Sequence, residues 1–95
     1  MVIGIVRITL VIHDCQSLKD KRQVLKSIME KVKGRFNVSI AEVGDNDLWQ
    51  RAAIGIAAVG TDGAFVNSVI DKTVFFIEGL YTAEIIDRKM ELINC

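Results

Sequence analysis

The chain has few residues whose types and spacing suit catalysis. His13, Asp14 and Cys15 are consecutive, so a base and an acid stand beside a thiol. Neighbouring residues on an extended strand point to opposite faces, however, and a nucleophile must meet its base in space. We therefore do not expect a catalytic thiol, and we expect Cys15 and Cys95 to be free, because thiolate metal sites need clustered pairs.

Carboxylates gather in one short segment, at Glu42, Asp45 and Asp47. They could hold a divalent cation, but they lack the glycine-centred spacing of a calcium loop, and Asp is common in ordinary turns. A structural turn is the favoured interpretation. The sequence also has no catalytic triad, zinc cluster, phosphate-binding loop or dinucleotide-binding fingerprint. We expect no enzymatic activity, no metal and no cofactor.

Basic residues are concentrated in one part of the chain. The formal net charge is +0, yet residues 17–36 hold seven Lys and Arg against two Asp and Glu, a local balance of +5. At about 100° per residue, four of these cations fall within roughly a 60° arc of a helix. Such a stripe suits a phosphate backbone or an acidic protein surface, but it is also typical of a solvated helix face in which Glu30 pairs with Lys26 and Lys33. The four cations are Lys19, Arg22, Lys26 and Lys33.

The hydrophobic pattern predicts the elements that position these groups. Residues 2–13 alternate and are rich in β-branched types, as in a strand. Ser17 followed by Asp20 is an acidic form of the helix capping box, and apolar residues then recur at helical spacing to residue 36, with an end near Gly34. The other predicted elements are strands over 37–43 and 48–59 with a turn at 44–47, a helix over 64–78 capped by Thr61 or Asp62, and a strand over 82–93.

These elements follow the order β-α-β-β-α-β within a single domain over residues 1–95. The order predicts a ferredoxin-like α+β fold, with two helices on one face of a four-stranded antiparallel sheet. Right-handed crossovers place the first and third strands in the centre of the sheet. The last strand carries charges on one side, which is typical of an edge strand.

The composition agrees with one small globular domain. The chain has 95 residues, of which 51% are hydrophobic and 25% charged, and it has no proline. This apolar content excludes a disordered chain, and the longest apolar run, residues 2–6, is too short to span a bilayer. The first residues lack the basic start of a secretory signal. We expect a cytoplasmic protein with no membrane association.

Two helices can cover only one face of the predicted sheet. The other face should be polar in a monomer, but here it is largely apolar, and a large apolar patch usually marks an interaction site. Its residues alternate with the core positions of the first and third strands, where Leu48 is expected to face the helices. The open face is predicted to display Ile3, Ile5, Arg7, Thr9, Trp49, Arg51, Ala53, Gly55 and Ala57.

This open face predicts a homodimer. Phe75 offers a second apolar contact, because it lies roughly 150° from the buried stripe of the second helix and should be exposed. The contact is therefore either the sheet face or the Phe75 side, and the sheet face is favoured because its apolar positions are contiguous. The predicted interface residues are Ile3, Ile5, Trp49, Ala53, Ala57 and Phe75.

Three stretches together form a specific pattern: S-L-K-D-K-R-Q-V-L-K-S at 17–27, R-F-N-V-S-I-A-E-V at 35–43 and D-L-W-Q-R-A at 47–52. The pattern resembles the YlxP-like family of small bacterial proteins of unassigned function. The resemblance implies a ferredoxin-like fold and no established catalytic residues. The genes of that family often lie beside those for a translation initiation factor and a ribosome-binding factor, which implies work on the ribosome or its RNA.

Two functions are predicted. The first is an RNA- or ribosome-associated accessory protein that binds through the four cations of residues 17–36, with Arg7, Arg51 and Trp49 as secondary contacts. The second is a protein-interaction or small-ligand regulatory module that dimerises through its open sheet face. Salt separates the two, because electrostatic binding weakens as salt rises whereas apolar association persists or tightens.

Overall fold

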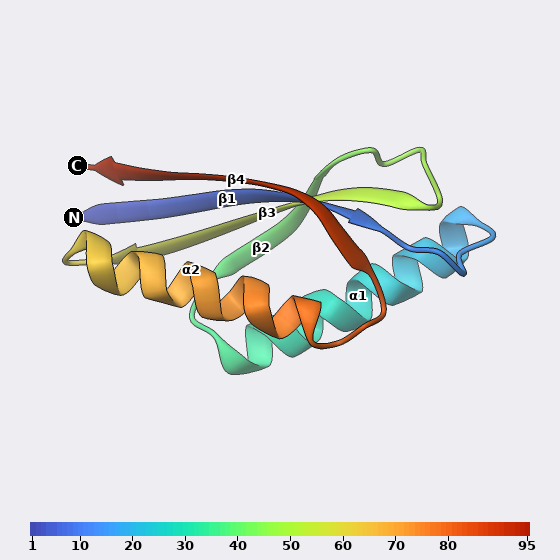
Figure 1. Cartoon of the computed structure of the whole chain (residues 1–95), viewed down its shortest axis with the longest axis horizontal. Helices are drawn as coiled ribbons and strands as arrows, with labels where there is room; N and C mark the ends of the chain where they lie inside the picture. Colours follow the sequence, from blue (N-terminus) through green and yellow to red (C-terminus); the bar gives the residue numbers. More distant parts are fainter.

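Four strands and two helices make up the computed structural model, which describes all 95 residues (Figure 1). Their order along the chain is β-α-β-β-α-β, as predicted. The elements are β1 (Val2–Val11), α1 (Leu18–Arg35), β2 (Ser39–Gly44), β3 (Arg51–Gly60), α2 (Gly63–Glu78) and β4 (Glu84–Asn94).

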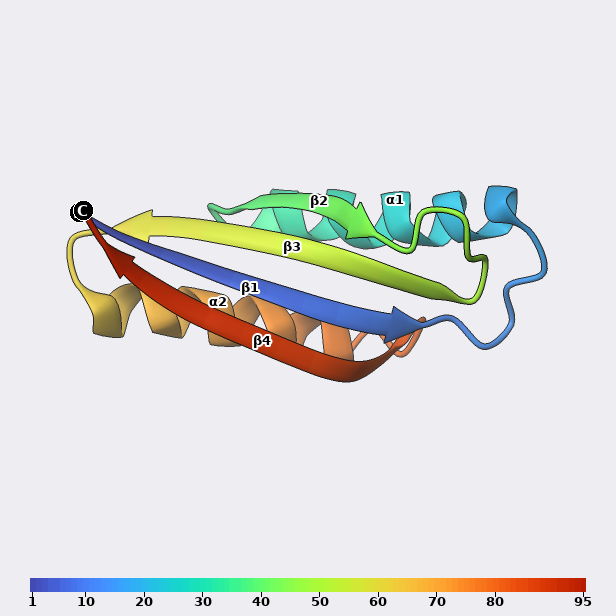
Figure 2. The same cartoon turned by 90° about the horizontal axis from the view of Figure 1, so that it is seen from above.

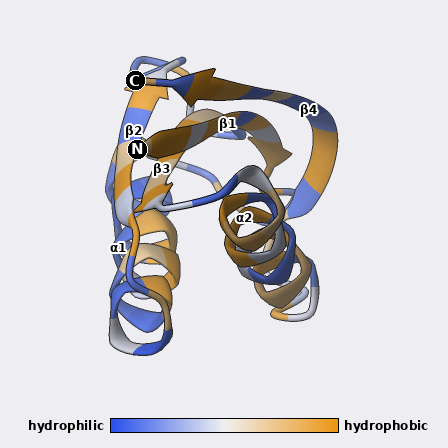
Figure 3. Ribbon diagram, turned by 90° about the vertical axis from the view of Figure 1, so that its left-hand side faces the viewer, coloured by the Kyte–Doolittle hydropathy of each residue, from blue (hydrophilic) through white to orange (hydrophobic).

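The strands form one sheet in the order β2-β3-β1-β4, and each neighbouring pair is antiparallel. Both helices lie on one face of this sheet, and Figure 2 shows the opposite face uncovered, with the helices behind it. Figure 3 shows the same two layers from one end. The predicted ferredoxin-like fold is confirmed, with β1 and β3 in the centre and β4 at an edge.

Capping side chains set the start of both helices. Ser17 Oγ accepts a hydrogen bond from the Asp20 backbone N–H at 3.1 Å, as the capping pattern predicts. At α2, Asp62 is the cap, and its Oδ1 accepts from the Phe65 backbone N–H at 2.8 Å. Helix α1 continues through Gly34, and neither helix is long and apolar enough to cross a membrane.

The hairpin turn is longer than predicted, which corrects the start of β3. That strand begins at Arg51, because the preceding segment folds into a turn in which Asp45 has a φ of 59° and the Leu48 N–H donates to the Asp45 carbonyl at 3.1 Å. Leu48 and Trp49 therefore precede β3, and the strand alternation that assigned them to the two faces of the sheet does not extend to them. Both side chains of this turn are exposed.

The core lies between the sheet and the helices. Helix α2 packs closely on β1 at Gly4, where an added Cβ would lie 2.5 Å from Val66 Cγ1. The largest apolar side chains that are fully buried come from β1, β3 and both helices: Ile8, Leu10, Ile28, Val32, Ile54, Val66, Ile70, Val74 and Ile77. This core fixes α1 and α2 against the sheet and leaves the opposite sheet face open.

The first and last residues lie side by side (Figure 1). The Met1 amino group donates to the Cys95 carbonyl at 3.1 Å, and the Cys95 N–H donates to the Met1 carbonyl at 2.8 Å. The pairing of β1 with β4 therefore extends to both ends of the chain.

Candidate functional site

Four cations of α1 form an exposed row, which we call the cationic ridge: Lys19, Arg22, Lys26 and Lys33. Only Lys26 takes part in an ion pair, with Glu30 at 4.0 Å, and both of these side chains are well exposed. Glu30 does not pair with Lys33. Three of the four charges are therefore available to an external anion, and the fourth is held only by a weak surface pair.

One of the ridge cations lies where a helix disfavours positive charge. Lys19 is in the first turn of α1, where the helix macrodipole is positive, and it has no ion-pair partner, whereas Asp20 in the same turn carries the charge that the dipole favours. Lys33 lies in the last turn, where the dipole favours a cation. Lys19 thus carries a small cost from the dipole, whereas Lys33 does not.

Lys21 is a basic residue of α1 whose role sequence reasoning missed. Its side chain is only 1% exposed, and its ammonium group donates to the backbone carbonyls of Asp45 and Leu48, each at 2.5 Å. It also pairs with Glu42 Oε2 at 3.0 Å. A signal was present, because Lys21 shares the helical stripe of the buried residues Leu25, Ile28 and Val32.

Two of the three hairpin carboxylates, Glu42 and Asp45, are engaged in ion pairs. Glu42 pairs with the buried Lys21, and Asp45 Oδ2 lies 3.3 Å from Arg51 Nε. These contacts join the turn to α1 and to the start of β3, which agrees with a structural turn. Arg51, predicted as a secondary RNA contact, is partly neutralised by Asp45.

His13 and Cys15 do not come together. His13 Nε2 lies 3.0 Å from Glu84 Oε1 on the surface, whereas Cys15 is 2% exposed and its thiol donates to the Ser17 carbonyl at 3.2 Å. No histidine therefore lies in place to deprotonate the thiol. Both cysteines are free, as expected.

The open sheet face is less continuous than predicted. Ile5 and Arg7 are exposed as expected, but Thr9 is 8% exposed and Ala53 only 1%. Ala53 is covered because the Arg7 side chain extends to this part of the sheet, where a Cβ added to Gly44 would lie 2.8 Å from Arg7 Nη2 and 3.3 Å from the Ala53 Cβ. Large apolar side chains are exposed around these positions: Ile5, Val43, Val59 and Ile93.

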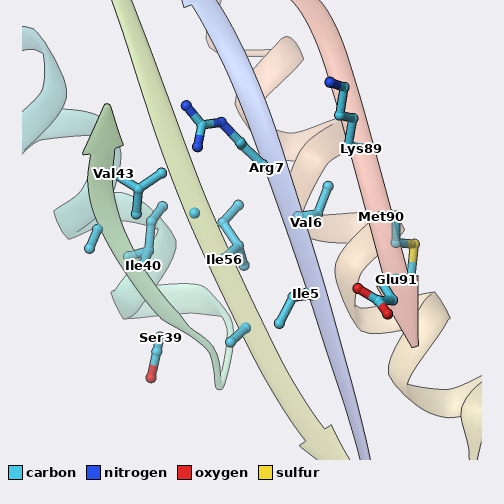
Figure 4. A pocket seen from close by; sticks show the side chains of 13 residues that line it. Ile5, Val6, Arg7, Ser39, Ile40, Val43, Ile56, Lys89, Met90 and Glu91 are labelled. Atoms are coloured by element: carbon cyan, nitrogen blue, oxygen red, sulfur yellow. The ribbon is translucent and has the colours of Figure 1, made fainter. Parts of the chain in front are cut away.

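A hollow of about 520 Å³ lies on this open face and contacts all four strands (Figure 4). We call it the sheet-face hollow. It forms where Ala41, Gly55 and Ala57 present little or no side chain beside larger neighbours such as Val43. Two cations and one carboxylate also line it: Arg7, Lys89 and Glu91.

Phe75 lies on α2, away from the sheet, and is 76% exposed, as predicted for a lone subunit. It borders two surface depressions, one of them shared with Arg35 and Phe76. Within that second depression, the Arg35 guanidinium lies 4.7 Å from the centre of the Phe76 ring. Phe75 is thus an apolar surface separate from the open sheet face, and its role in an interface stays a prediction.

Comparison with known proteins finds a family but no activity. A family model described as "Protein of unknown function (DUF503)" matches residues 3–90. One similar relative is "Uncharacterized protein YlxP" of Bacillus subtilis (strain 168), which is 42% identical over 76 residues, covering 80% of this chain and 83% of the relative. The resemblance to the YlxP-like family is confirmed.

Proposed function

Because this chain belongs to the DUF503 family, whose function is unknown, we propose a function from its own geometry: it binds RNA phosphates through the cationic ridge of α1. The protein would act as an accessory factor on ribosomal RNA in the cytoplasm. Binding, rather than catalysis, is the activity proposed. Phosphate contacts position a protein without reading bases, so the interaction should be largely independent of sequence.

One observation carries this proposal. The ridge holds four exposed cations on a single helix, and only Lys26 has an acidic partner. A solvated helix face normally interleaves both signs of charge and stabilises itself through pairs three or four residues apart. Here one of the unpaired cations, Lys19, lies in the first turn of the helix, where it opposes the macrodipole. An external polyanion accounts for both features.

The direct test measures RNA binding against salt. Fluorescence anisotropy with a labelled single-stranded RNA should give a log-log salt slope of roughly −2 to −4, as about three or four phosphate contacts require. Replacing Lys19, Arg22, Lys26 and Lys33 together by Gln should abolish binding while the circular dichroism spectrum stays unchanged. Wild-type affinity in this quadruple variant at low salt would show that the ridge is only a solvated face.

A pair of double variants controls for net charge. Lys19→Gln with Arg22→Gln removes two ridge charges, whereas Lys31→Gln with Lys72→Gln removes two exposed charges elsewhere. Lys31 lies on another side of α1, and Lys72 belongs to α2. The ridge pair should weaken binding much more than the control pair. Equal losses would mean that only the total charge matters.

The other predicted RNA contacts have smaller proposed roles. Trp49 is exposed in the hairpin turn and could stack on a base, which would add roughly 1–3 kcal/mol and persist at high salt. Arg51 is paired with Asp45, and Arg7 lies on the sheet face. Trp49→Ala should therefore lower affinity at high salt, whereas Arg51→Gln should change it little.

A second candidate function is self-association as an interaction module. Exposed apolar side chains favour it, on the sheet face at Val59 and Ile93 and on α2 at Phe75. Light scattering at tens of micromolar should then show a dimer that persists in high salt. Val59→Glu or Phe75→Glu, whichever dissociates it, identifies the contact. A strict monomer in wild type would remove this candidate.

A further inference from the structure

Two cationic residues lie opposite each other on neighbouring strands in the sheet-face hollow. Arg7 on β1 and Lys89 on β4 are register partners with exposed side chains, and the Arg7 guanidinium is directed over β3 toward Gly44 (Figure 4). Like charges directly opposite each other on adjacent strands are unfavourable. Neither residue takes part in an ion pair within the chain. An anion that reaches both charged groups would balance two positive charges that have no partner in the chain.

The space beside these cations has the size of a ligand site. The hollow is an open depression of about 520 Å³, and small-molecule pockets usually measure roughly 300–1,000 Å³. Register places Ala41, Gly55, Arg7 and Lys89 in one row across the sheet. Arg7 and Lys89 therefore belong to β1 and β4, and the Arg7 guanidinium extends over β3 toward Gly44, beside the residues of β2 and β3 that have little or no side chain.

We infer that the sheet-face hollow binds a small molecule that has an anionic head, either carboxylate or phosphate, and a flat apolar body. The head would lie between Arg7, whose guanidinium can hold two oxygens at once, and the ammonium of Lys89. The body would lie beside Ala57 and contact Ile5 and Val43, which line the same hollow. This ligand is separate from the RNA proposed for α1, because α1 lies on the covered face of the sheet.

Charge argues against a second copy as the occupant. A two-fold dimer contact brings the same patch of each subunit together. Centred on the hollow, it would bury two copies of Arg7 and Lys89 against each other, with Glu91 as the only carboxylate each lining supplies. Burying unpaired charge is costly. The hollow also has no aromatic lining residue on which an RNA base could stack.

Titration of the ¹⁵N-labelled chain with benzoate and with phenyl phosphate tests the inference. Both probes should shift the amide signals of Gly44, Gly55 and Ala57 in a saturable way, and the tighter probe identifies the head group. Benzamide has nearly the shape of benzoate but no charge, so it should bind at least about tenfold more weakly. The absence of saturable shifts, or equal binding of benzamide, would overturn the inference.

Substitutions at two exposed residues of the hollow, and one control substitution on α2, locate the site. Arg7→Gln and Lys89→Gln should each weaken binding of the better probe by about tenfold or more, because each removes a hydrogen bond to a charged group. Lys72→Gln on α2 should leave it unchanged. Retained affinity in both hollow variants would overturn the inference, and the amide spectrum of α2 reports that each variant is folded.

Occupation of the open sheet face by a second copy of the chain would give a different result in these titrations. If the wild-type chain is a dimer that Val59→Glu dissociates, and the probes shift only the dissociated form, a second copy occupies the face and the inference is overturned. The quadruple ridge variant should still bind the probe. A failure of RNA binding and a failure of this inference are therefore measured separately.

Discussion

Lys21 is a charged residue that behaves as part of the core. Removing an ammonium group from water is costly unless every donor finds a partner nearby. The carbonyls of Asp45 and Leu48 accept hydrogen bonds from this group, and the carboxylate of Glu42 pairs with its charge. The side chain thus ties the first turn of α1 to the hairpin between β2 and β3.

We expect Lys21→Met to destabilise the protein strongly. The substitution leaves Glu42 and the two carbonyls without their donor, and losing one partner of a buried pair costs about 3 kcal/mol. Urea unfolding should show this loss, whereas Lys26→Met, at an exposed position of the same helix, should change stability by less than about 0.5 kcal/mol. Equal stability of the two variants would contradict a stabilising role for the contacts that Lys21 makes with the hairpin.

Adding Glu42→Gln to Lys21→Met should recover part of the lost stability. The second substitution removes the carboxylate that the first leaves uncompensated, so the two effects should not add. A double-mutant cycle in urea measures the coupling between the two side chains. Simple additivity would mean that Lys21 acts through the carbonyls alone.

The contacts of Lys21 also show which features of the structure cannot be predicted from the sequence. The position of Lys21 within the apolar stripe of α1 can be read from its spacing to Leu25 and Ile28. Its acceptors cannot, because they are backbone carbonyls brought together by a turn with Asp45 in a left-handed conformation. The same turn moved Trp49 out of β3. Side-chain patterns predict faces of elements, whereas carbonyl positions depend on loop geometry.

At the scale of elements, α2 can approach β1 closely because Gly4 has no side chain. A Cβ at Gly4 would lie 2.5 Å from Val66 Cγ1 and 3.3 Å from a Leu92 methyl carbon. We expect Gly4→Ala to push α2 outward and lower stability by about 1–3 kcal/mol, the usual cost of overpacking. Thermal unfolding measures the effect.

Gly34→Ala is the matched control and should act in the opposite direction. Nothing lies within 4 Å of a Cβ at Gly34, which belongs to the last turn of α1. Alanine has a higher helix propensity and restricts the unfolded chain, so stability should rise by up to about 1 kcal/mol. If both alanine variants lost similar stability, close packing at Gly4 would not be the cause.

The start of α2 can be tested in the same way. Asp62 caps the helix, so Asp62→Ala should cost about 1 kcal/mol, whereas Thr61→Ala should stay within about 0.5 kcal/mol. Chemical denaturation of both variants measures the difference. The order of elements and the Ser17 cap could be predicted from local patterns, but the choice between Thr61 and Asp62 required the path of the chain into the helix.

At the scale of the whole molecule, the sheet has one covered face and one open face. Alternation along β1 and β3 predicted this division and placed Ile5 and Arg7 on the open side. The sheet-face hollow could not be predicted, because it depends on the alignment of Ala41, Gly55 and Lys89 from three different strands. Register between distant strands is set by the assembled sheet.

The two thiols should report on folding of the whole chain. Cys95 is exposed and Cys15 is buried. A colorimetric thiol reagent should therefore label one cysteine quickly in the native protein and both in urea. Cys95→Ser should remove the fast phase and leave the slow one. Rapid reaction of Cys15 in native buffer would show that residues 12–17 open easily.

The neighbouring ends of the chain allow its order to be rearranged. Because Met1 and Cys95 are hydrogen-bonded to each other, a short Gly-Ser linker could join them into a ring without disturbing the sheet. Cutting that ring between Tyr81 and Thr82, both exposed, would also release Tyr81 from its φ of 56°. Such a circular permutant should fold, with β4 as its first strand. A cut between Asn46 and Asp47 would instead free the carbonyls that Lys21 holds, so that permutant should melt at a clearly lower temperature.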